Sequence, residues 1–316
     1  KKYLKNLKSK KVLDIGCNDG TLLSLFKKEG CKTFGIEPTE AAIEAKKKGH
    51  IIFKEYFDKT SSKKIRKKIG NIDIITFTNV FAHIEDFNDL LFSLKNISNE
   101  NTLIIIENHY LGEVIKKTQF DTFYHEHPRT YSLKSFINIS KKINMSLIDF
   151  KFVKRYNGNI RVYLKKSGKI YKSRKRINQS LKLEKSKISK IKNFQKKVNK
   201  WKLNKKKQIE KITKKFGPLP AKAFPGRASI SINLLNLNSN HISKVYEKNS
   251  SLKVNKFVPG TDIKILKEKY FKVKHFDNGI LINLAWHISN EIRNYLRRKM
   301  KFKGKIIDII SNSDFK

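Results

Sequence analysis

From Lys11 to Asn108 the chain alternates short apolar runs with longer amphipathic segments, and this alternation restricts its fold more than any other feature. The apolar runs are "KVLDIG", "KTFGIE", "HIIFKEYF", "IDIITFTNV" and "TLIIIEN". The segments between them, such as "TLLSLFKKEG" and "EDFNDLLFSLKNI", carry apolar residues at the three- and four-residue spacing of helices. In "TEAAIEAKKKG", Thr39 behind Pro38 is the expected N-cap. Strands alternating with helices predict an α/β fold with a doubly wound parallel sheet.

The rest of the chain predicts three parts. A helix "SLKSFINISKKI" and the strands "SLIDFKFVKRY" and "IRVYLKKS" close a first domain, which we expect at 1–168. Residues 169–216 contain no Gly or Pro and space their apolar residues for packing, which predicts a connector of one or two long amphipathic helices. After "FGPLP", the runs "AKAF", "ISKVYE", "GILINLAW" and "GKIIDII" predict a second, smaller α/β domain at 217–316, with helices near 228–237 and 287–299.

The formal net charge of +44 would attract a polyanion, so nucleic acid is one alternative partner. However, lysine appears in nearly every segment, together with abundant Ile and Asn, which favours a compositional bias expressed on solvated faces. The lysine-rich stretch from Arg174 to Lys215 and its end also offer few aromatic rings for base stacking. We therefore disfavour nucleic acid as a partner, whereas a phosphorylated or nucleotide-linked substrate would benefit from such a field.

Cysteine content and hydropathy indicate the compartment. Cys17 and Cys31 are too few for a disulfide framework or a four-thiolate zinc site, so a reducing cytoplasm is expected. No run approaches the roughly 18 consecutive apolar residues of a membrane span, and no signal peptide is recognisable. The sequence opens "KKYLKNLKSKK" without Met, which is typical of a fragment that lacks its first residues.

The stretch "VLDIGCNDGTLL" predicts a strand, a glycine turn and a helix start. Gly16 and Gly20 would let the backbone approach a ligand at the carboxyl edge of the strand. The stretch has neither the full G-x-G-x-x-G spacing of dinucleotide binders nor the Lys-Ser/Thr of a P-loop. Instead, Asp14 and Asp19 put negative charge near the turn, which favours a cationic ligand over a pyrophosphate. Glu37 ends the second predicted strand, where a carboxylate can accept hydrogen bonds from a ribose diol.

A histidine block, Tyr124–His127 in "FDTFYHEHPRTYS", follows the fifth predicted strand, and His83 in "NVFAHI" follows the fourth. Both therefore lie at the carboxyl edge, where a doubly wound sheet binds ligands. A zinc site is disfavoured because there is no H-E-x-x-H motif and no thiolate pair. A purely structural loop is the other alternative. A neutral imidazole is well suited to removing a proton near pH 7, so we favour proton transfer.

The strand, the D-x-G-x-x-x-G turn and "GIEP" together resemble the S-adenosylmethionine site of class I methyltransferases. Other stretches make the chain similar to sugar C-methyltransferases, which methylate a ring carbon of a nucleotide-linked keto-deoxysugar. These stretches are "LDIGCNDGTLL", "GIEPTEAA", "NVFAHIEDFNDLL", "IIIENHYLG", "FDTFYHEHPRTYS", "NGNIRVYL", "VPGTDIKI" and "LAWHISNEI". The likeness covers nearly the whole chain, and its Y-x-E-H block is the most specific part.

The chain departs from this family at two places. The family usually begins with a cysteine-rich zinc-binding domain, and this sequence starts where that domain would end. The family's glycine-rich turn in the small domain reads "AFPGRASISI" here and lacks the later glycine.

The resemblance implies a Rossmann-like class I methyltransferase domain, a C-terminal nucleotide-sugar-binding domain and S-adenosyl-L-methionine as cofactor. It implies His127 as the base that generates an enolate, supported by Glu126, Tyr124 and His83, without a metal. The implied cofactor-binding residues are Asp14, Gly16, Asn18, Gly20, Glu37 and Asn79. The implied substrate-binding residues are Asn159, Gly260 and Arg227, the last meeting a diphosphate at a helix N-terminus. Methylation of an oxygen or nitrogen of another small molecule is the alternative reaction.

Overall fold

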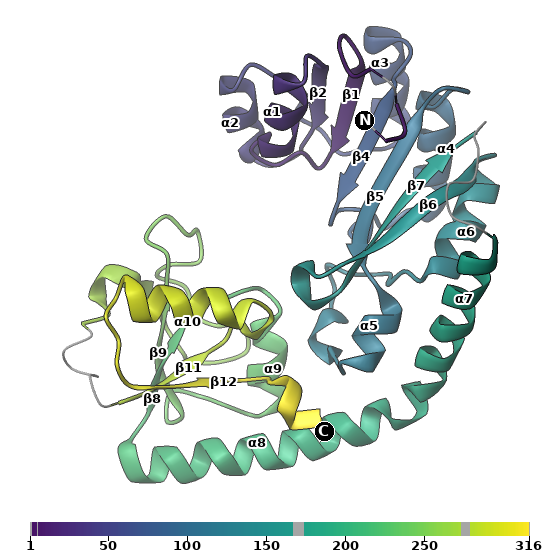
Figure 1. Cartoon of the computed structure of the whole chain (residues 1–316). Coiled ribbons are helices and arrows are strands. Elements are labelled where there is room, and N and C mark those ends of the chain that lie inside the picture. The colour runs from purple at the N-terminus through teal and green to yellow at the C-terminus, as the bar shows by residue number, and fades with distance from the viewer. Residues whose placement is uncertain (1, 5, 167–173, 273–278, 316) are drawn as a thin grey trace. The chain divides into compact units, whose positions relative to one another are not determined.

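The computed structural model of the chain describes residues 2–4, 6–166, 174–272 and 279–315 (Figure 1). The chain folds into two compact units. The first unit comprises residues 1–113 and 125–188, and the second comprises residues 114–124 and 189–316. The second unit therefore includes a short segment that interrupts the sequence of the first unit directly before His125.

A seven-stranded sheet in the order β3-β2-β1-β4-β5-β7-β6 forms the centre of the first unit. Its strands are β1 (Lys11–Ile15), β2 (Lys32–Ile36), β3 (Ile51–Phe53), β4 (Ile74–Thr78), β5 (Leu103–His109), β6 (Ser146–Val153) and β7 (Asn159–Lys165). Strands β1 to β5 are parallel, whereas β7 runs antiparallel to β5 and β6. The chain reverses its direction of strand addition between β1 and β4, and such a reversal opens a crevice at the carboxyl ends of the strands.

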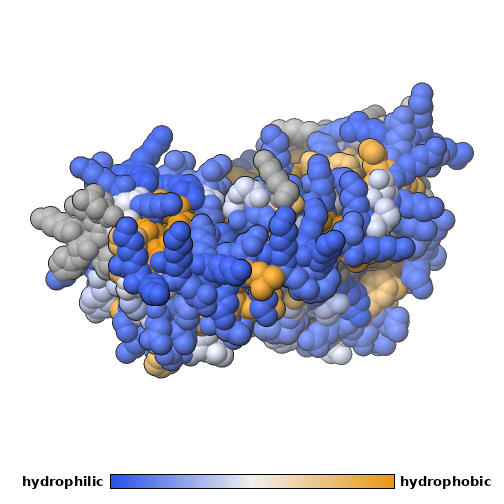
Figure 2. All heavy atoms as spheres, turned by 90° about the horizontal axis from the view of Figure 1, so that it is seen from below, coloured by the Kyte–Doolittle hydropathy of each residue, from blue (hydrophilic) through white to orange (hydrophobic). Residues whose placement is uncertain are grey.

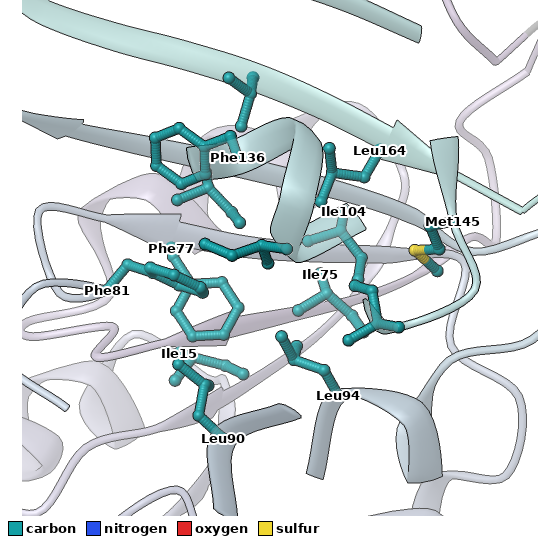
Figure 3. Packing of buried hydrophobic residues seen from close by; sticks show 14 of the residues in the cluster. Ile15, Ile75, Phe77, Phe81, Leu90, Leu94, Ile104, Phe136, Met145 and Leu164 are labelled. Carbon is teal, nitrogen blue, oxygen red and sulfur yellow. The ribbon is translucent and has the colours of Figure 1, made fainter. Parts of the chain in front are cut away.

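Helices cover both faces of this sheet, because side chains alternate between the faces along each strand. The helices are α1 (Thr21–Lys28), α2 (Ala41–Lys47), α3 (Lys59–Ile69), α4 (Phe87–Ile97), α6 (Leu133–Lys142) and α7 (Arg174–Ser189). The short helix α5 (Leu111–Lys116) contains the boundary between the two units. Ile15 and Phe77 point to the face of α3, α4 and α6, where they join the main hydrophobic cluster (Figure 3). Val12 and Ile74 point to the opposite face, against α1 and α2.

The second unit contains a five-stranded parallel sheet in the order β10-β9-β8-β11-β12. Its elements are β8 (Leu219–Lys222), β9 (Ile242–Glu247), β10 (Ile265–Lys267), β11 (Ile280–Asn283), β12 (Lys305–Asp308), α8 (Phe194–Phe216), α9 (Ala228–Leu234) and α10 (Ser289–Arg298). Helix α8 buries Val198, Trp201 and Ile209 and exposes most of its lysines. Trp201 also packs against Phe120, with ring centroids 4.7 Å apart, so the segment 114–124 contributes Phe120 to this core.

The surface agrees with the low apolar content of the sequence. Figure 2 shows a face on which hydrophilic residues predominate and hydrophobic residues form only small patches. Among the described residues, no helix has both the length and the apolar character needed to cross a bilayer.

The predicted doubly wound sheet and second α/β domain are confirmed, but local details differ. Strand β10 was not predicted, because its short sequence "ILK" lies within a lysine-rich stretch. Thr39 is not the N-cap of α2, which begins at Ala41 behind Glu40. The Thr39 hydroxyl donates instead to Glu37 at 2.6 Å.

The division between the units also differs from the expected domains. The boundary expected at residue 168 lies outside the described residues, and the units divide between Ile188 and Ser189. Helix α7 stays with the first unit because Glu184 accepts hydrogen bonds from the backbone N–H groups of Leu133 at 2.6 Å and Lys134 at 3.1 Å. The expected connector at 169–216 is therefore shared between the two units.

Candidate active site

A cavity of about 860 Å³ lies in the first unit, at the carboxyl edge of the sheet. It is lined by parts of β1, β4, β5 and β7, by Glu37 directly after β2 and by one side of α1. Of the residues predicted to bind a cofactor, Asp14, Gly16, Asn18, Glu37 and Asn79 line this cavity. The sequence therefore predicted residues from three separate segments, the glycine turn, Glu37 and Asn79, that meet around one space.

Glu37 is buried and its carboxylate is held in place by the protein. One oxygen accepts a hydrogen bond from the backbone N–H of Asn18 at 3.0 Å. The other accepts from the backbone N–H of Thr39 at 3.0 Å and from its hydroxyl at 2.6 Å. A carboxylate fixed in this way, with lone pairs left for further bonds, can accept hydrogen bonds from a ribose diol in the cavity.

Asp14 is buried beside Thr76, whose hydroxyl donates to it at 2.6 Å. Burial raises the pKa of Asp14 to about 7, and the nearby negative charge of Glu37 also raises it. The hydrogen bond from Thr76 acts in the opposite direction and lowers this pKa. A cation in the cavity would therefore be favoured by both carboxylates. Asp19 differs, because Lys48 lies 2.7 Å from its carboxylate and, with Thr21, lowers its pKa to about 2.

The two glycines of the turn have different roles. Gly16 has a φ of +68° and lines the cavity, and a Cβ there would lie 2.4 Å from Cγ2 of Val80. Gly20 has a φ of +73°, and a Cβ there would lie 2.7 Å from Cδ2 of the His50 ring. Gly20 is not among the residues that line the cavity, so the start of α1 and close packing account for its position.

A hydrogen-bonded network lies at the β5 and β7 side of the cavity. The side-chain amide of Asn159 donates to Asn79 at 2.8 Å and to Glu107 at 3.3 Å. The Arg161 guanidinium contacts Glu107 through Nε at 2.7 Å and Nη2 at 2.5 Å. Asn159 was predicted to bind substrate. In the structure its side chain holds that of Asn79, a predicted cofactor-binding residue, through a hydrogen bond. Glu107 and Arg161 were not predicted, although an acid near the end of the apolar run "IIIENH" was an available signal.

Three histidines from separate segments meet in the first unit. The His127 ring lies between those of His83 and His109, with centroids 4.7 and 5.2 Å apart. Arg129 helps to bring His127 close to His83, because its guanidinium donates to the carbonyls of Ile84 at 3.0 Å and Glu85 at 2.7 Å. His109 was not predicted as a site residue, and its position as the last residue of β5 was the only signal in the sequence.

The histidine cluster and the cavity are neighbours. Tyr156 lines the cavity, and its ring centroid is 5.9 Å from that of His109. His127 is half-buried and Glu126 is exposed. Tyr124 is half-buried and belongs to the segment that folds with the second unit. Within the described ranges, no group of three or more His, Cys, Asp or Glu side chains could hold a metal ion.

The two residues predicted to bind substrate in the second unit, Arg227 and Gly260, have structural roles there. Arg227 is buried and donates to the Asp121 carboxylate from Nε at 2.8 Å and Nη2 at 2.5 Å. Trp286 Nε1 donates to the same carboxylate at 2.7 Å. The guanidinium is thus paired with Asp121 in this structure, and its contact with a diphosphate stays a prediction. Gly260 has a φ of +76°, and a Cβ there would lie 2.5 Å from Oδ1 of Asn233, so its turn requires glycine.

Comparison with known proteins gives matches along nearly the whole chain. Residues 1–149 match a family model described as a methyltransferase domain, and residues 155–310 match a C-methyltransferase C-terminal domain. The C-methyltransferase NovU of Streptomyces niveus is 28% identical over 153 residues, which are 48% of this chain and 36% of NovU. An uncharacterized protein of Haemophilus influenzae is 31% identical over 114 residues, which are 34% of this chain and 45% of that protein. The matched segments thus span less than half the length of either relative.

Likenesses to solved structures are weak. The magnesium protoporphyrin IX methyltransferase ChlM of Synechocystis PCC 6803, with bound SAH, is 15% identical with a TM-score of 0.41, covering 51% of this chain and 76% of ChlM. A SAM dependent methyltransferase of Archaeoglobus fulgidus is 17% identical with a TM-score of 0.39, covering 56% of this chain and 79% of that one. These scores add nothing to the family matches.

Proposed function

We propose that the chain is a C-methyltransferase that transfers a methyl group from S-adenosylmethionine to carbon, because two consecutive segments match a methyltransferase domain and a C-methyltransferase C-terminal domain. The proposed acceptor is a nucleotide-linked keto-deoxysugar, methylated next to its ketone. The observation that carries the proposal is an acid-lined cavity whose edge residue Tyr156 adjoins a cluster of three histidines. Such a site can hold a cationic methyl donor beside a group that removes a proton.

The cavity residues fit this cofactor by charge and by hydrogen bonding. Glu37, fixed by Asn18 and Thr39, accepts hydrogen bonds from the ribose hydroxyls. Asp14 supplies negative charge toward the sulfonium, and Gly16 allows close approach because it has no side chain. Asn79 and Asn18 complete the lining from β4 and the glycine turn. When bound, the cofactor supplies an electrophilic methyl group.

His127 is the proposed general base. It removes the proton from the carbon beside the ketone, and the resulting enolate carbon is the nucleophile for the methyl group. His83, at 4.7 Å between ring centroids, and Tyr124 donate hydrogen bonds to the developing enolate oxygen. Glu126 orients the imidazole of His127, and the His109 ring packs against it with centroids 5.2 Å apart. A carbon acid beside a ketone needs such a base, whereas an alcohol or amine acceptor needs less assistance.

The second unit is the proposed binding module for the nucleotide part of the substrate. Its parallel sheet reverses its strand order between β8 and β11, and ligands of such sheets bind at the carboxyl ends beside the reversal. Asn283 ends β11 there, and its amide donates to Asp308 at 2.7 Å. Because Arg227 is bound to Asp121, the proposal assigns nucleotide contacts to this edge as a whole rather than to that arginine.

The experiment that tests the function is product analysis with methyl-labelled S-adenosylmethionine and a panel of nucleotide-linked keto-deoxysugars. We expect label on a carbon next to the ketone, located by mass spectrometry and NMR, and no product with His127→Asn. Label on oxygen or nitrogen would replace the proposal with the alternative reaction. Failure of the wild-type chain to bind S-adenosylmethionine in calorimetry would remove methyl transfer altogether.

A further inference from the structure

The cavity is acidic along most of its lining but basic at one end. Asp14, Asp19, Glu37 and Glu107 contribute carboxylates, whereas the lining guanidinium groups are those of Arg155 and Arg161. Arg155 lies over the ring of Tyr156, with its Cζ 5.0 Å from the ring centroid. Arg161 instead lies against Glu107, so an acid and a base are held side by side at the β5 and β7 end of the cavity.

Strand register aligns this pair with the rest of the cofactor site. Glu107 of β5 pairs with Thr78 of β4 and with Arg161 of β7, at the level where β1 ends. Because side chains alternate along strands, Glu107 and Arg161 share the face of the sheet that carries Asp14. Across the sheet the charges therefore follow the order Glu37 on the β2 side, Asp14 on β1, then Glu107 and Arg161.

The same order of groups occurs along S-adenosylmethionine. Its ribose diol is followed by the cationic sulfonium and then by an amino-acid end with one ammonium and one carboxylate. Glu37 and Asp14 match the diol and the sulfonium under the proposed function. An adjacent carboxylate and guanidinium are the complement of an adjacent ammonium and carboxylate, because each ionic group then faces one of opposite sign.

Burial and hydrogen bonding suit Arg161 for binding a ligand. The Glu107 side chain is 4% exposed and the Arg161 side chain 39% exposed, so the acid is buried and part of the arginine side chain is accessible. Glu107 uses the Nε hydrogen and one at Nη2. A guanidinium has five N–H donors, so this contact leaves donors that can form a two-point contact with a carboxylate.

We propose that Arg161, oriented by Glu107, binds the α-carboxylate of the methionine end of the cofactor while Glu107 faces its ammonium. This inference rests on the proposed use of S-adenosylmethionine and adds the residues that recognise its amino-acid end. Arg161 is thus a cofactor-binding residue. Glu107 binds the ammonium of the cofactor and also positions the Arg161 guanidinium. The alternative is that the pair only stabilises the contact between β5 and β7.

Two ligands separate these alternatives: S-adenosylhomocysteine, which has the amino-acid end, and 5′-methylthioadenosine, which lacks it. By calorimetry, we expect Arg161→Gln to weaken S-adenosylhomocysteine binding about 10- to 100-fold, as for loss of a hydrogen bond to a charged group. Binding of 5′-methylthioadenosine should change less than about twofold. Arg66→Gln, which alters an arginine outside the cavity lining, should leave both affinities within about twofold.

Equal loss of both ligands in Arg161→Gln, with an unchanged melting temperature, would overturn the inference, and so would no loss of either. If Arg161→Gln does not fold, Arg161→Lys keeps the charge without the planar fork and should still weaken S-adenosylhomocysteine selectively. A wild-type chain that binds neither ligand refutes the proposed function itself. A wild-type chain that binds both ligands with the same affinity refutes only the role of Arg161.

Discussion

Replacing Asp14 by Asn should make the protein more stable and its cofactor site weaker. Asn keeps the shape of Asp and can still accept the hydrogen bond from the Thr76 hydroxyl. What it loses is the charge, which the folded protein accommodates poorly because Asp14 is 3% exposed and lies near Glu37. Stability and cofactor binding therefore make opposite demands on this residue.

The size and pH range of the stability effect follow from the pKa of Asp14. Folding raises this pKa from 3.8 to about 7, so the native state retains the proton to higher pH than the unfolded chain. The contribution of Asp14 to the free energy of unfolding is therefore most favourable below pH 4, and it declines as the pH rises from about 4 to about 7. The complete rise corresponds to about 4 kcal/mol, which is an upper bound for the gain from Asp14→Asn at pH 8. At pH 4 the gain should nearly vanish.

Urea unfolding of wild type and Asp14→Asn at pH 5 and pH 8 measures this difference in the free energy of unfolding. Thr76→Val removes the hydrogen bond that the Thr76 hydroxyl donates to the Asp14 carboxylate, so it should raise the pKa of Asp14 further. This variant should therefore destabilise the protein more at pH 8 than at pH 5. Calorimetry should show S-adenosylmethionine binding about tenfold more tightly to wild type at pH 8 than at pH 6, because the cation requires ionised Asp14. Equal stabilities of wild type and Asp14→Asn at both pH values would refute the reasoning.

Three further predictions concern other residues. Glu37→Gln should weaken S-adenosylmethionine binding by about 1–3 kcal/mol through loss of ribose hydrogen bonds, and unchanged affinity in calorimetry would remove Glu37 from the site. His127→Asn should lower turnover by roughly 10²–10⁴ without weakening cofactor binding, and should abolish exchange of the substrate proton with deuterated water. Exchange that persists in this variant would transfer the role of base to His83. Arg227→Ala should lower the free energy of unfolding by about 3–5 kcal/mol because it leaves Asp121 as a buried unpaired charge, whereas an unchanged urea midpoint would contradict the buried pair.

The parts of the fold that were predictable from sequence are those with a local signal. Strands β1, β2, β4 and β5 are runs of apolar residues between amphipathic helices, and the glycine turn after β1 requires positive φ at Gly16 and Gly20. These features depend on neighbours in sequence, so periodicity and residue type indicate them. The acids Asp14 and Glu37 were predictable because they lie directly at strand ends.

Features that depend on distant partners were not predictable. Arg227 follows a strand and precedes a helix, which locally indicates an anion site, but its partner Asp121 is 106 residues away. Likewise, Arg161 contacts Glu107 only because β7 pairs with β5, a pairing that the local sequence does not indicate. The sequence shows which residue types are present at such positions but not which charges will neutralise one another.

The segment 114–124 has a consequence for how the chain acquires its structure during synthesis. Asp121 leaves the ribosome 106 residues before Arg227 and further ahead of Trp286, yet all three share one buried hydrogen-bonded cluster. At synthesis rates of about 5–20 residues per second, Asp121 waits roughly 5–20 s for its arginine. During that interval the first unit can collapse around its own sheet, while the stretch leading to the histidines is still without its final neighbours. Completion of that stretch therefore waits until Arg227 and Trp286 have been synthesised, and a nascent chain halted before residue 227 would carry a formed sheet and an unanchored loop.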